Sequence, residues 1–243
     1  MVGKLSLTSL SLKLKRLNEL GKDELSALET INMATRVVSR GDDILREGSH
    51  PASIFILMKG IACRYKVLPH GERQITSLCT PGDICNLQTL MFDELDHNIG
   101  ALSECVVGLA ATERVGLLVR SFAGIRTALV KDAVIEAAMA REWILNVGRR
   151  SSYEAVAHLL CEIFARLSNV DSDCRSEYST GLTQANIADC IGISNVHVNR
   201  VLKKMAKGGF ISFERGNLIV HDWGVLQDAA GFNPAYLRPC AKA

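Results

Sequence analysis

The segment from Leu182 to Met205 constrains the fold of this chain more than any other feature. Thr183 is a residue type that commonly caps a helix, and the apolar residues after it fall on one face of a short helix. Gly192 stands where the chain must turn sharply, a position that suits a residue without Cβ. Ser194 can then cap a second helix. The pattern predicts two helices joined by a tight turn, which is a helix-turn-helix.

The second of these helices is predicted to be amphipathic with a basic outer face. Four apolar residues take the spacing of a buried face: Val198, Val201, Leu202 and Met205. The outward positions are mostly polar or basic: Asn195, Val196, His197, Asn199, Arg200, Lys203 and Lys204. Amides and guanidinium groups can pair with base edges, while lysine attracts phosphate. Because no acidic residue occurs from 194 to 213, this face is predicted to bind double-stranded DNA.

A predicted β-hairpin follows the second helix. Gly208 and Gly209 end the helix, and two short β-type runs are joined at Arg215-Gly216-Asn217. A helix-turn-helix followed by such a hairpin is a winged helix, in which Arg215 at the tip would reach a phosphate. The candidate DNA-binding set is therefore Thr183, Ser194, Asn195, Val196, His197, Asn199, Arg200, Lys203, Lys204 and Arg215. The alternative is an ordinary helical hairpin with a solvated polar face.

The N-terminal half has a different texture. After a short helical lead, β-type runs of 5–8 residues separated by glycine turns extend from about Val37 to Val119. This spacing is typical of a β-sandwich or β-roll. From about Ala123 the texture becomes helical: the segment Lys131–Arg149 has no proline, and Val156–Leu167 carries a second apolar stripe.

These textures predict an α+β fold with a jelly-roll-like N-terminal β-roll, a long central helix and a C-terminal winged helix-turn-helix. Within the central helix we expect Ile135, Ala138, Met139, Trp143 and Val147 to form the apolar stripe. The predicted divisions are a sensor domain at 20–122, the central helix at 123–150, a DNA-binding domain at 151–225 and a C-terminal tail at 226–243.

Composition excludes several classes of protein. Lys and Arg total 28 against 26 for Asp and Glu, so the overall charge indicates no particular partner. No apolar run approaches the length of about 20 residues that spans a bilayer, and no membrane partner is expected. The eight cysteines include no C-x-x-C pair. We therefore expect free thiols in a reducing, cytoplasmic setting.

An enzyme is not expected either. A β-roll can host a catalytic metal, as cupin-like barrels do, but this requires a cluster such as His-x-His with a nearby Glu. The six histidines are all isolated, and no nucleophile elbow or phosphate-binding glycine motif occurs. The sequence therefore offers no catalytic residues and no metal site.

Three stretches carry a resemblance to a known family. Arg40–Gly48 with Phe55–Gly60 resembles the opening of a cyclic-nucleotide-binding-like β-roll, and Thr80–Asp83 is similar to its later Gly-Asp turn. Leu182–Ile211 looks like the DNA-binding motif of the Crp/Fnr family of bacterial transcription regulators. The resemblance covers roughly residues 20–225.

The resemblance implies a homodimer held by the central helix, binding a two-fold-symmetric DNA site with one recognition helix per half-site. Carried over by position, Asn195, Val196 and Arg200 would read bases, with His197 and Asn199 near the backbone or flanking bases. RNA polymerase is a further implied partner. Many relatives have a glutamate where this chain has Val196, so a different operator is expected.

The effector region departs from members that bind cyclic AMP. Those members neutralise the cyclic phosphate with an arginine, whereas this chain has no Lys or Arg from Asp83 to Glu113. A buried phosphodiester without a cation would be strongly disfavoured, so cyclic AMP is not expected. No cysteine precedes Cys63, which argues against the family's N-terminal iron–sulfur cluster. Any effector pocket is expected at Asn86, Leu87, Gln88, His97 and Asn98.

Other effectors are open but less favoured than plain packing. Haem would need an axial ligand from the set His70, His97, Cys79 and Cys85. Thiol oxidation would involve Cys79 and Cys85, which flank a turn, or Cys190, and His158 with Cys161 supplies only two of the ligands of a metal site. The alternative function is a ligand- or redox-responsive sensor whose helix-turn-helix serves protein contacts.

Overall fold

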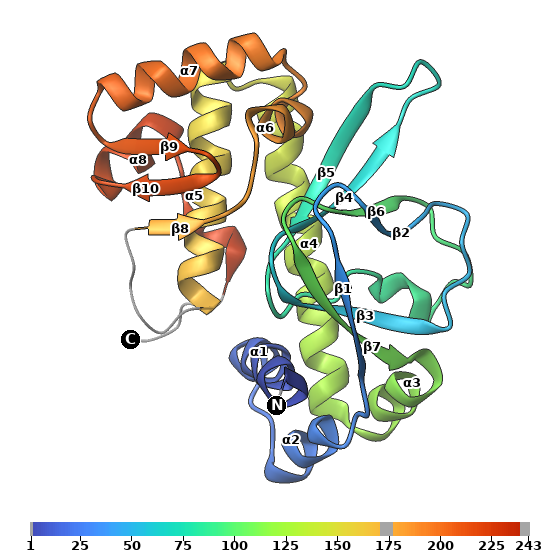
Figure 1. The fold of residues 1–243 in the computed structure, drawn as a ribbon. Helices are drawn as coiled ribbons and strands as arrows, with labels where there is room; N and C mark the ends of the chain where they lie inside the picture. Colours follow the sequence, from blue (N-terminus) through green and yellow to red (C-terminus); the bar gives the residue numbers. More distant parts are fainter. Residues whose placement is uncertain (1, 171–176, 239–243) are drawn as a thin grey trace. The chain divides into compact units, whose positions relative to one another are not determined.

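The computed structural model describes residues 2–170 and 177–238, with side chains for 9–168 and 177–238. The chain divides into two compact units, drawn in Figure 1. Over the described residues, the first unit comprises the chain up to 65 together with 78–136. The second comprises 66–77 and 137–238.

A β-roll of two sheets lies in the first unit, apart from residues 66–77, which belong to the second. One sheet has the order β1 (Ala34–Val38), β7 (Cys105–Ala111), β3 (Ser53–Lys59). The other has the order β2 (Asp43–Leu45), β6 (Asn98–Ala101), β4 (Ala62–Val67), β5 (Arg73–Cys79). Strands of both sheets contribute to one buried apolar cluster that includes Phe55, Leu57, Ile99 and Val107. The predicted β-roll is confirmed, because alternate residues of the two sheets meet in a shared core.

Gly60, which follows β3, shows why glycine occupies the turns of this roll. Its φ is +91°, and a Cβ at this position would lie 2.3 Å from the carbonyl oxygen of Glu104. Any side chain would therefore clash with backbone as well as strain the dihedral angle.

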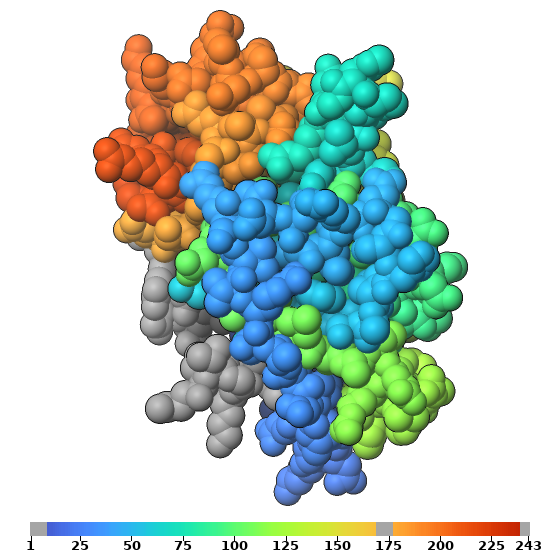
Figure 2. Space-filling model, turned by 45° about the vertical axis from the view of Figure 1, so that its right-hand side comes forward, coloured from blue at the N-terminus to red at the C-terminus, as the bar shows by residue number. Residues whose placement is uncertain are grey.

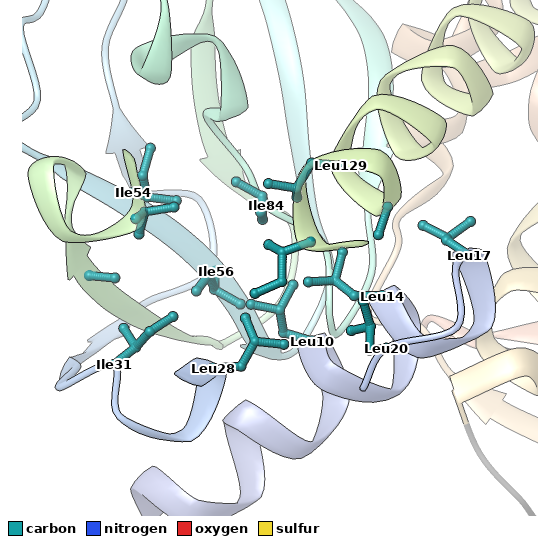
Figure 3. Close-up of a cluster of buried hydrophobic side chains, with 14 residues drawn as sticks. Leu10, Leu14, Leu17, Leu20, Leu28, Ile31, Ile54, Ile56, Ile84 and Leu129 are labelled. Carbon is teal, nitrogen blue, oxygen red and sulfur yellow. The ribbon is translucent and has the colours of Figure 1, made fainter. Parts of the chain in front are cut away.

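A second apolar cluster holds the N-terminal helices on the roll. Helix α1 (Val2–Leu17) contributes Leu10, Leu14 and Leu17, and α2 (Lys22–Glu29) contributes Leu28. They pack with Ile54, Ile56, Ile84 and Leu129, as Figure 3 shows, and also with Ile125. The unit also contains a 3-10 turn, η1 (Leu87–Leu90).

The predicted β-type texture up to Val119 is wrong at its end. The last strand stops at Ala111, and α3 (Thr112–Ser121) follows directly. The apolar residues Val115, Leu117 and Val119 alternate as in a strand, but only Val115 is fully buried. The segment is helical because one face of the helix packs against the rest of the unit. Alternation of apolar residues alone could not predict this.

The long central helix is present as α4 (Ala123–Gly148). Met139 and Trp143 of the expected stripe are buried, whereas Val147 is exposed. The reason is that α4 is apolar on more than one side, with Val130, Val134 and Ile144 exposed at 58%, 60% and 64%. A helix of this kind has no single buried stripe to read from sequence.

The second unit holds the helix-turn-helix. The helices are α5 (Ser152–Val170), α6 (Gln184–Ile191), α7 (Asn195–Lys207) and α8 (Trp223–Ala230), with a final 3-10 turn η2 (Pro234–Leu237). A small antiparallel sheet has the order β8 (Glu177–Ser179), β10 (Asn217–Val220), β9 (Ile211–Glu214). Strand β8 has only three residues, which carry too little pattern to be predicted from the sequence.

The predicted C-terminal tail is wrong for the residues that the structure describes. Its boundary at 226 falls inside α8, and the segment after α8 packs on α5. The Tyr236 hydroxyl donates to Glu162 Oε2 at 2.9 Å, and the Tyr236 ring stacks on His158. His158 is 1% exposed, and Cys161 is fully buried. The preference for core packing at these two positions is therefore confirmed.

The part of the chain that the structure describes contains no metal-binding cluster and no membrane-spanning helix. The six cysteines within it are free and buried, while Cys174 and Cys240 lie outside the described residues. No cluster of three or more His, Cys, Asp or Glu side chains suited to a metal occurs among those residues. Of the helices described, none is both long and apolar enough to cross a membrane.

Candidate nucleic-acid interface

Local signals position the first helix of the motif. The Thr183 hydroxyl accepts a hydrogen bond from the backbone N–H of Asn186 at 3.0 Å, which caps α6. Ile187, Cys190 and Ile191 are buried on its inner face. Gly192 adopts a left-handed conformation with φ of +74°, which a residue with Cβ would adopt only at a cost. The predicted cap and turn are confirmed.

The second helix, α7, begins at its own cap. Ser194 Oγ accepts from the backbone N–H of His197 at 3.3 Å. The four residues predicted to face inward are all buried: Val198, Val201, Leu202 and Met205. These contacts fix the rotation of α7 about its axis, and so determine which residues point outward.

The exposed face of α7 is the candidate nucleic-acid interface, which we define as Asn195, Val196, Arg200, Lys203 and Lys207. All five side chains are exposed, Val196 by 71%. In Figure 2 this part of the chain is orange and its atoms lie at the surface. The interface has three cations and lies in a stretch, 194–213, with no acidic residue, so it has a positive potential. A thymine methyl is the kind of group that an exposed valine would contact.

Two predicted DNA contacts instead have partners within the protein. His197 Nε2 lies 2.7 Å from the hydroxyl of Ser152 at the start of α5, and Asn199 Nδ2 donates to Gln184 Oε1 at 2.9 Å. Both side chains are half-buried. The sequence could not show these links, because their partners lie 45 and 15 residues away.

Lys204 also has an internal neighbour. Its Nζ lies 4.8 Å from the centre of the Tyr153 ring, a cation–π contact with the first turn of α5. Ser152 and Tyr153 therefore support α7, a role that the sequence did not indicate. The sequence feature that could have indicated this role is their position in the first turn of α5.

The wing has the predicted form. Strands β9 and β10 are antiparallel, and Arg215 lies between them with φ of +50°, a left-handed conformation that non-glycine residues seldom adopt. Its side chain is exposed. Thr180 N–H and Oγ1 both donate to the Gly216 carbonyl, at 2.8 and 2.7 Å, which ties the wing to the segment before α6.

Two of the five residues of the predicted effector pocket make contacts that serve the fold. Asn86 is fully buried, and its amide serves the fold: Oδ1 accepts from Phe55 N–H, while Nδ2 donates to Ser53 O and Thr89 Oγ1. Leu87 packs on the apolar cluster of Figure 3. These two residues therefore have structural roles.

The other three predicted pocket residues make polar contacts of their own. Gln88 Nε2 lies 3.5 Å from His97 Nε2, and Asn98 Oδ1 accepts from Glu47 N–H. A small cavity in the same unit is lined entirely by apolar residues, none of which belongs to the predicted set. An effector site at Gln88, His97 and Asn98 stays a prediction.

Comparison with known proteins matches both units. Residues 35–120 match the cyclic nucleotide-binding domain family, and residues 154–229 match the Crp-like helix-turn-helix domain family. The nitrogen fixation regulation protein FixK of Azorhizobium caulinodans is 25% identical over 72% of this chain and 70% of its own. The transcriptional activator protein FnrL of Cereibacter sphaeroides is 25% identical over 86% and 85%, respectively.

A solved structure shares the fold. FixK2 from Bradyrhizobium japonicum superposes with a TM-score of 0.73 at 20% identity, covering 82% of this chain and 98% of that chain. The likeness supports the fold assigned above, which contains a β-roll, a long helix and a helix-turn-helix.

Proposed function

Because this chain belongs to the Crp/Fnr family of DNA-binding transcription regulators, we propose that it acts as a homodimer on a two-fold-symmetric operator. Each α7 would lie in the major groove of one half-site, with half-sites about one helical turn, roughly 34 Å, apart. FnrL, a relative, is named a transcriptional activator, and RNA polymerase is the protein partner that we propose.

The exposed face of α7 is the observation that carries this proposal. Arg200 can form paired hydrogen bonds with a guanine edge, and Asn195 with an adenine edge. Lys203 and Lys207 are exposed for phosphate contact. The internal partners of His197 and Asn199 leave Asn195, Val196 and Arg200 as the proposed base readers. Arg215 at the wing tip, together with Ser194 and Thr183 at the helix caps, is proposed to lie along the backbone.

The outer stripe of α4 supports the homodimer. Positions 130, 134, 137, 141, 144 and 148 alternate spacings of four and three, the repeat of a two-stranded coiled coil. Val130, Val134 and Ile144 are exposed on this stripe, and only Arg141 interrupts it with a charge. A second copy of α4 would bury these residues against their equivalents.

We further propose that cyclic AMP is not the effector. No Lys or Arg occurs from 83 to 113, the stretch that resembles the family's phosphate-binding region. A structural observation also supports this proposal. The side-chain amide of Asn86, in the same stretch, already forms hydrogen bonds with protein groups.

A binding experiment tests the proposal. Duplexes selected from a random pool would be titrated by fluorescence anisotropy at several salt concentrations. The logarithm of the affinity should fall with log salt by about 0.9 for each phosphate contacted. Ile144→Asp should give a monomer and weaken binding, while Val147→Asp, exposed on α4 but off the stripe, should do neither.

Affinity that does not change with salt, or a selection that yields no preferred sequence, would contradict the proposal. Such a result would favour the alternative, in which the helix-turn-helix serves protein contacts. A stable Ile144→Asp dimer would contradict the role of the α4 stripe alone.

A further inference from the structure

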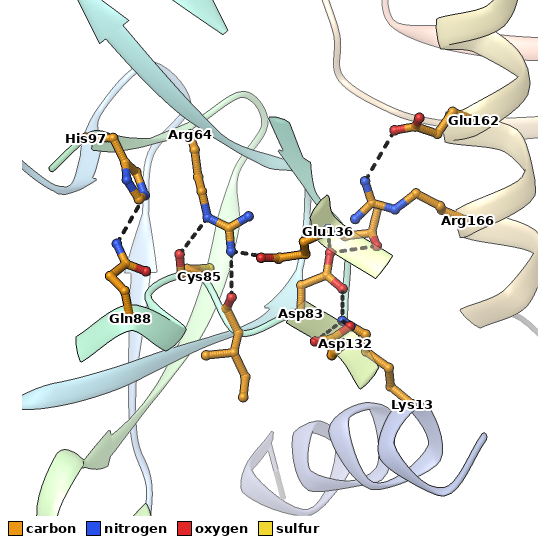
Figure 4. Close-up of polar contacts among 12 residues, drawn as sticks. Lys13, Arg64, Asp83, Cys85, Gln88, His97, Asp132, Glu136, Glu162 and Arg166 are labelled. Atoms are coloured by element: carbon orange, nitrogen blue, oxygen red, sulfur yellow. Dashed lines mark hydrogen bonds and ion pairs between the residues drawn. The ribbon is translucent and has the colours of Figure 1, made fainter. Parts of the chain in front are cut away.

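Two acidic residues of α4 face the β-roll of their own unit. Asp132 and Glu136 lie four residues apart, so they occupy the same side of the helix one turn from each other. Asp132 is buried, and Glu136 is half-buried. Each is joined by a cation to the short segment Asp83–Cys85, as Figure 4 shows.

Lys13 of α1 makes the first link. Its Nζ lies 2.8 Å from Asp83 Oδ1 and 2.7 Å from Asp132 Oδ1. Burial opposes the charge on this lysine, but the two carboxylates outweigh it and raise the pKa of Lys13, so the ammonium form persists at neutral pH. Leu10 and Leu14, buried on the same helix, hold the Lys13 backbone in place.

Arg64 of β4 makes the second link. Its Nε donates to the carbonyl oxygen of Cys85 and its Nη2 to that of Ile84, both at 2.9 Å. The same Nη2 lies 2.9 Å from Glu136 Oε1. A planar guanidinium group is suited to such a fixed set of acceptors, which an ammonium group could not reproduce.

Buried ion pairs of this kind add little to stability compared with apolar packing, because desolvation offsets their attraction. What they provide is a defined geometry between the groups they join. The segment they hold, 83–85, begins the stretch that resembles the family's effector-binding region. Every group in the two links that join this segment to α4 belongs to the protein.

From these contacts we propose that Lys13 and Arg64 are positioning residues that hold α4 for DNA binding in place of a small-molecule effector. The inference rests on the dimeric DNA-binding function proposed above. Asp132 and Glu136 flank Val134, an exposed member of the proposed dimer stripe. Loss of either link would release this stretch of α4 and weaken the alignment of two copies on DNA.

The test uses the full chain, unfolded in denaturant and refolded in buffer free of small molecules. Affinity for a selected duplex is measured for wild type, Lys13→Met, Arg64→Met and the matched control Lys15→Met, whose residue is exposed on the same helix. We expect wild type and Lys15→Met to bind equally. The other two variants should bind at least about 10-fold more weakly, within the usual range of coupling between sites.

A double variant separates positioning from stability. Lys13→Met with Asp132→Asn removes a charge from each side of the first link, so it should recover part of the melting temperature that Lys13→Met loses. It should not recover DNA affinity, because the link is still absent. Recovery of both together would show that Lys13 acts only through stability, and would overturn the proposal.

Two further results would overturn it. One is wild-type affinity in Lys13→Met and Arg64→Met. The other is a refolded wild type that binds the duplex only after cyclic AMP, cyclic GMP or a small-molecule extract of bacterial cells is added. A refolded wild type that binds no duplex under any of these conditions would instead defeat the proposed function itself.

Discussion

The exposed cations of α7 and two cations of the β-roll unit, Lys13 and Arg64, have opposite surroundings. Arg200, Lys203 and Lys207 are exposed on α7. Lys13 and Arg64 have side chains only 26% and 11% exposed and pair with carboxylates. An exposed cation keeps its hydration until a ligand replaces it, whereas a buried one has already exchanged water for protein groups. The same residue types therefore bind a partner in one place and fix geometry in the other.

The largest expected effect comes from leaving Glu136 without its cation. Arg64→Met should lower the free energy of unfolding by about 2–4 kcal/mol, because the half-buried Glu136 carboxylate and the carbonyl oxygens of Ile84 and Cys85 lose their donor. Arg200→Met on the exposed face should change it by less than about 0.5 kcal/mol. Urea denaturation of both variants at neutral pH measures the difference. Equal losses would remove the contrast between the two groups of cations.

A pH effect should follow from His158, a buried ionisable group of the second unit. Burial and, secondarily, Arg150 lower the pKa of His158 to about 4, against a slight opposing effect of Glu142. Between pH 6.5 and 4 the unfolded chain therefore binds more protons than the folded one, and stability falls as pH falls. From pH 7 to 5 the contribution of His158 should decrease by about 2 kcal/mol.

Comparing denaturation of wild type and His158→Gln across this range isolates that contribution. The variant should show a flatter pH dependence. His221→Gln, whose residue is exposed, serves as the control and should follow wild type. A His158→Gln curve parallel to wild type would mean that His158 has the same pKa in the folded and unfolded chains.

On the exposed face, Arg200→Ala should remove about 1–3 kcal/mol of discrimination between the selected duplex and an unrelated one. Asn199→Ala should remove less, because its amide is already hydrogen-bonded to Gln184. Competition titrations with both duplexes measure the two effects. If Asn199→Ala relaxes the preference as much as Arg200→Ala does, the internal hydrogen bond opens on DNA.

The smallest expected effect is that of Lys203→Ala. A phosphate contact carries no sequence information, so the variant should bind all duplexes more weakly by a similar factor. The salt dependence should become shallower by about 0.9 for each phosphate that the variant no longer neutralises. Lys22→Ala, exposed in the first unit, should leave the slope unchanged. A sequence-dependent effect of Lys203→Ala would assign it to base reading.

The sequence alone determined the helix-turn-helix, because each of its signals acts over a few residues. The caps at Thr183 and Ser194 bond to residues three positions on, and the left-handed turn needs only Gly192. The buried face of α7 follows from helical spacing. Such local preferences do not depend on where the rest of the chain lies.

Tertiary structure decided what those local signals leave open. Lys13 meets partners 70 and 119 residues away, and His197 is drawn to Ser152 across 45 residues. The exposure of Val147 and the helical form of residues 112–121 also depend on which neighbours cover them. A charge or an apolar side chain has no fixed role in the sequence, because its energy depends on the solvent and partners that folding leaves around it.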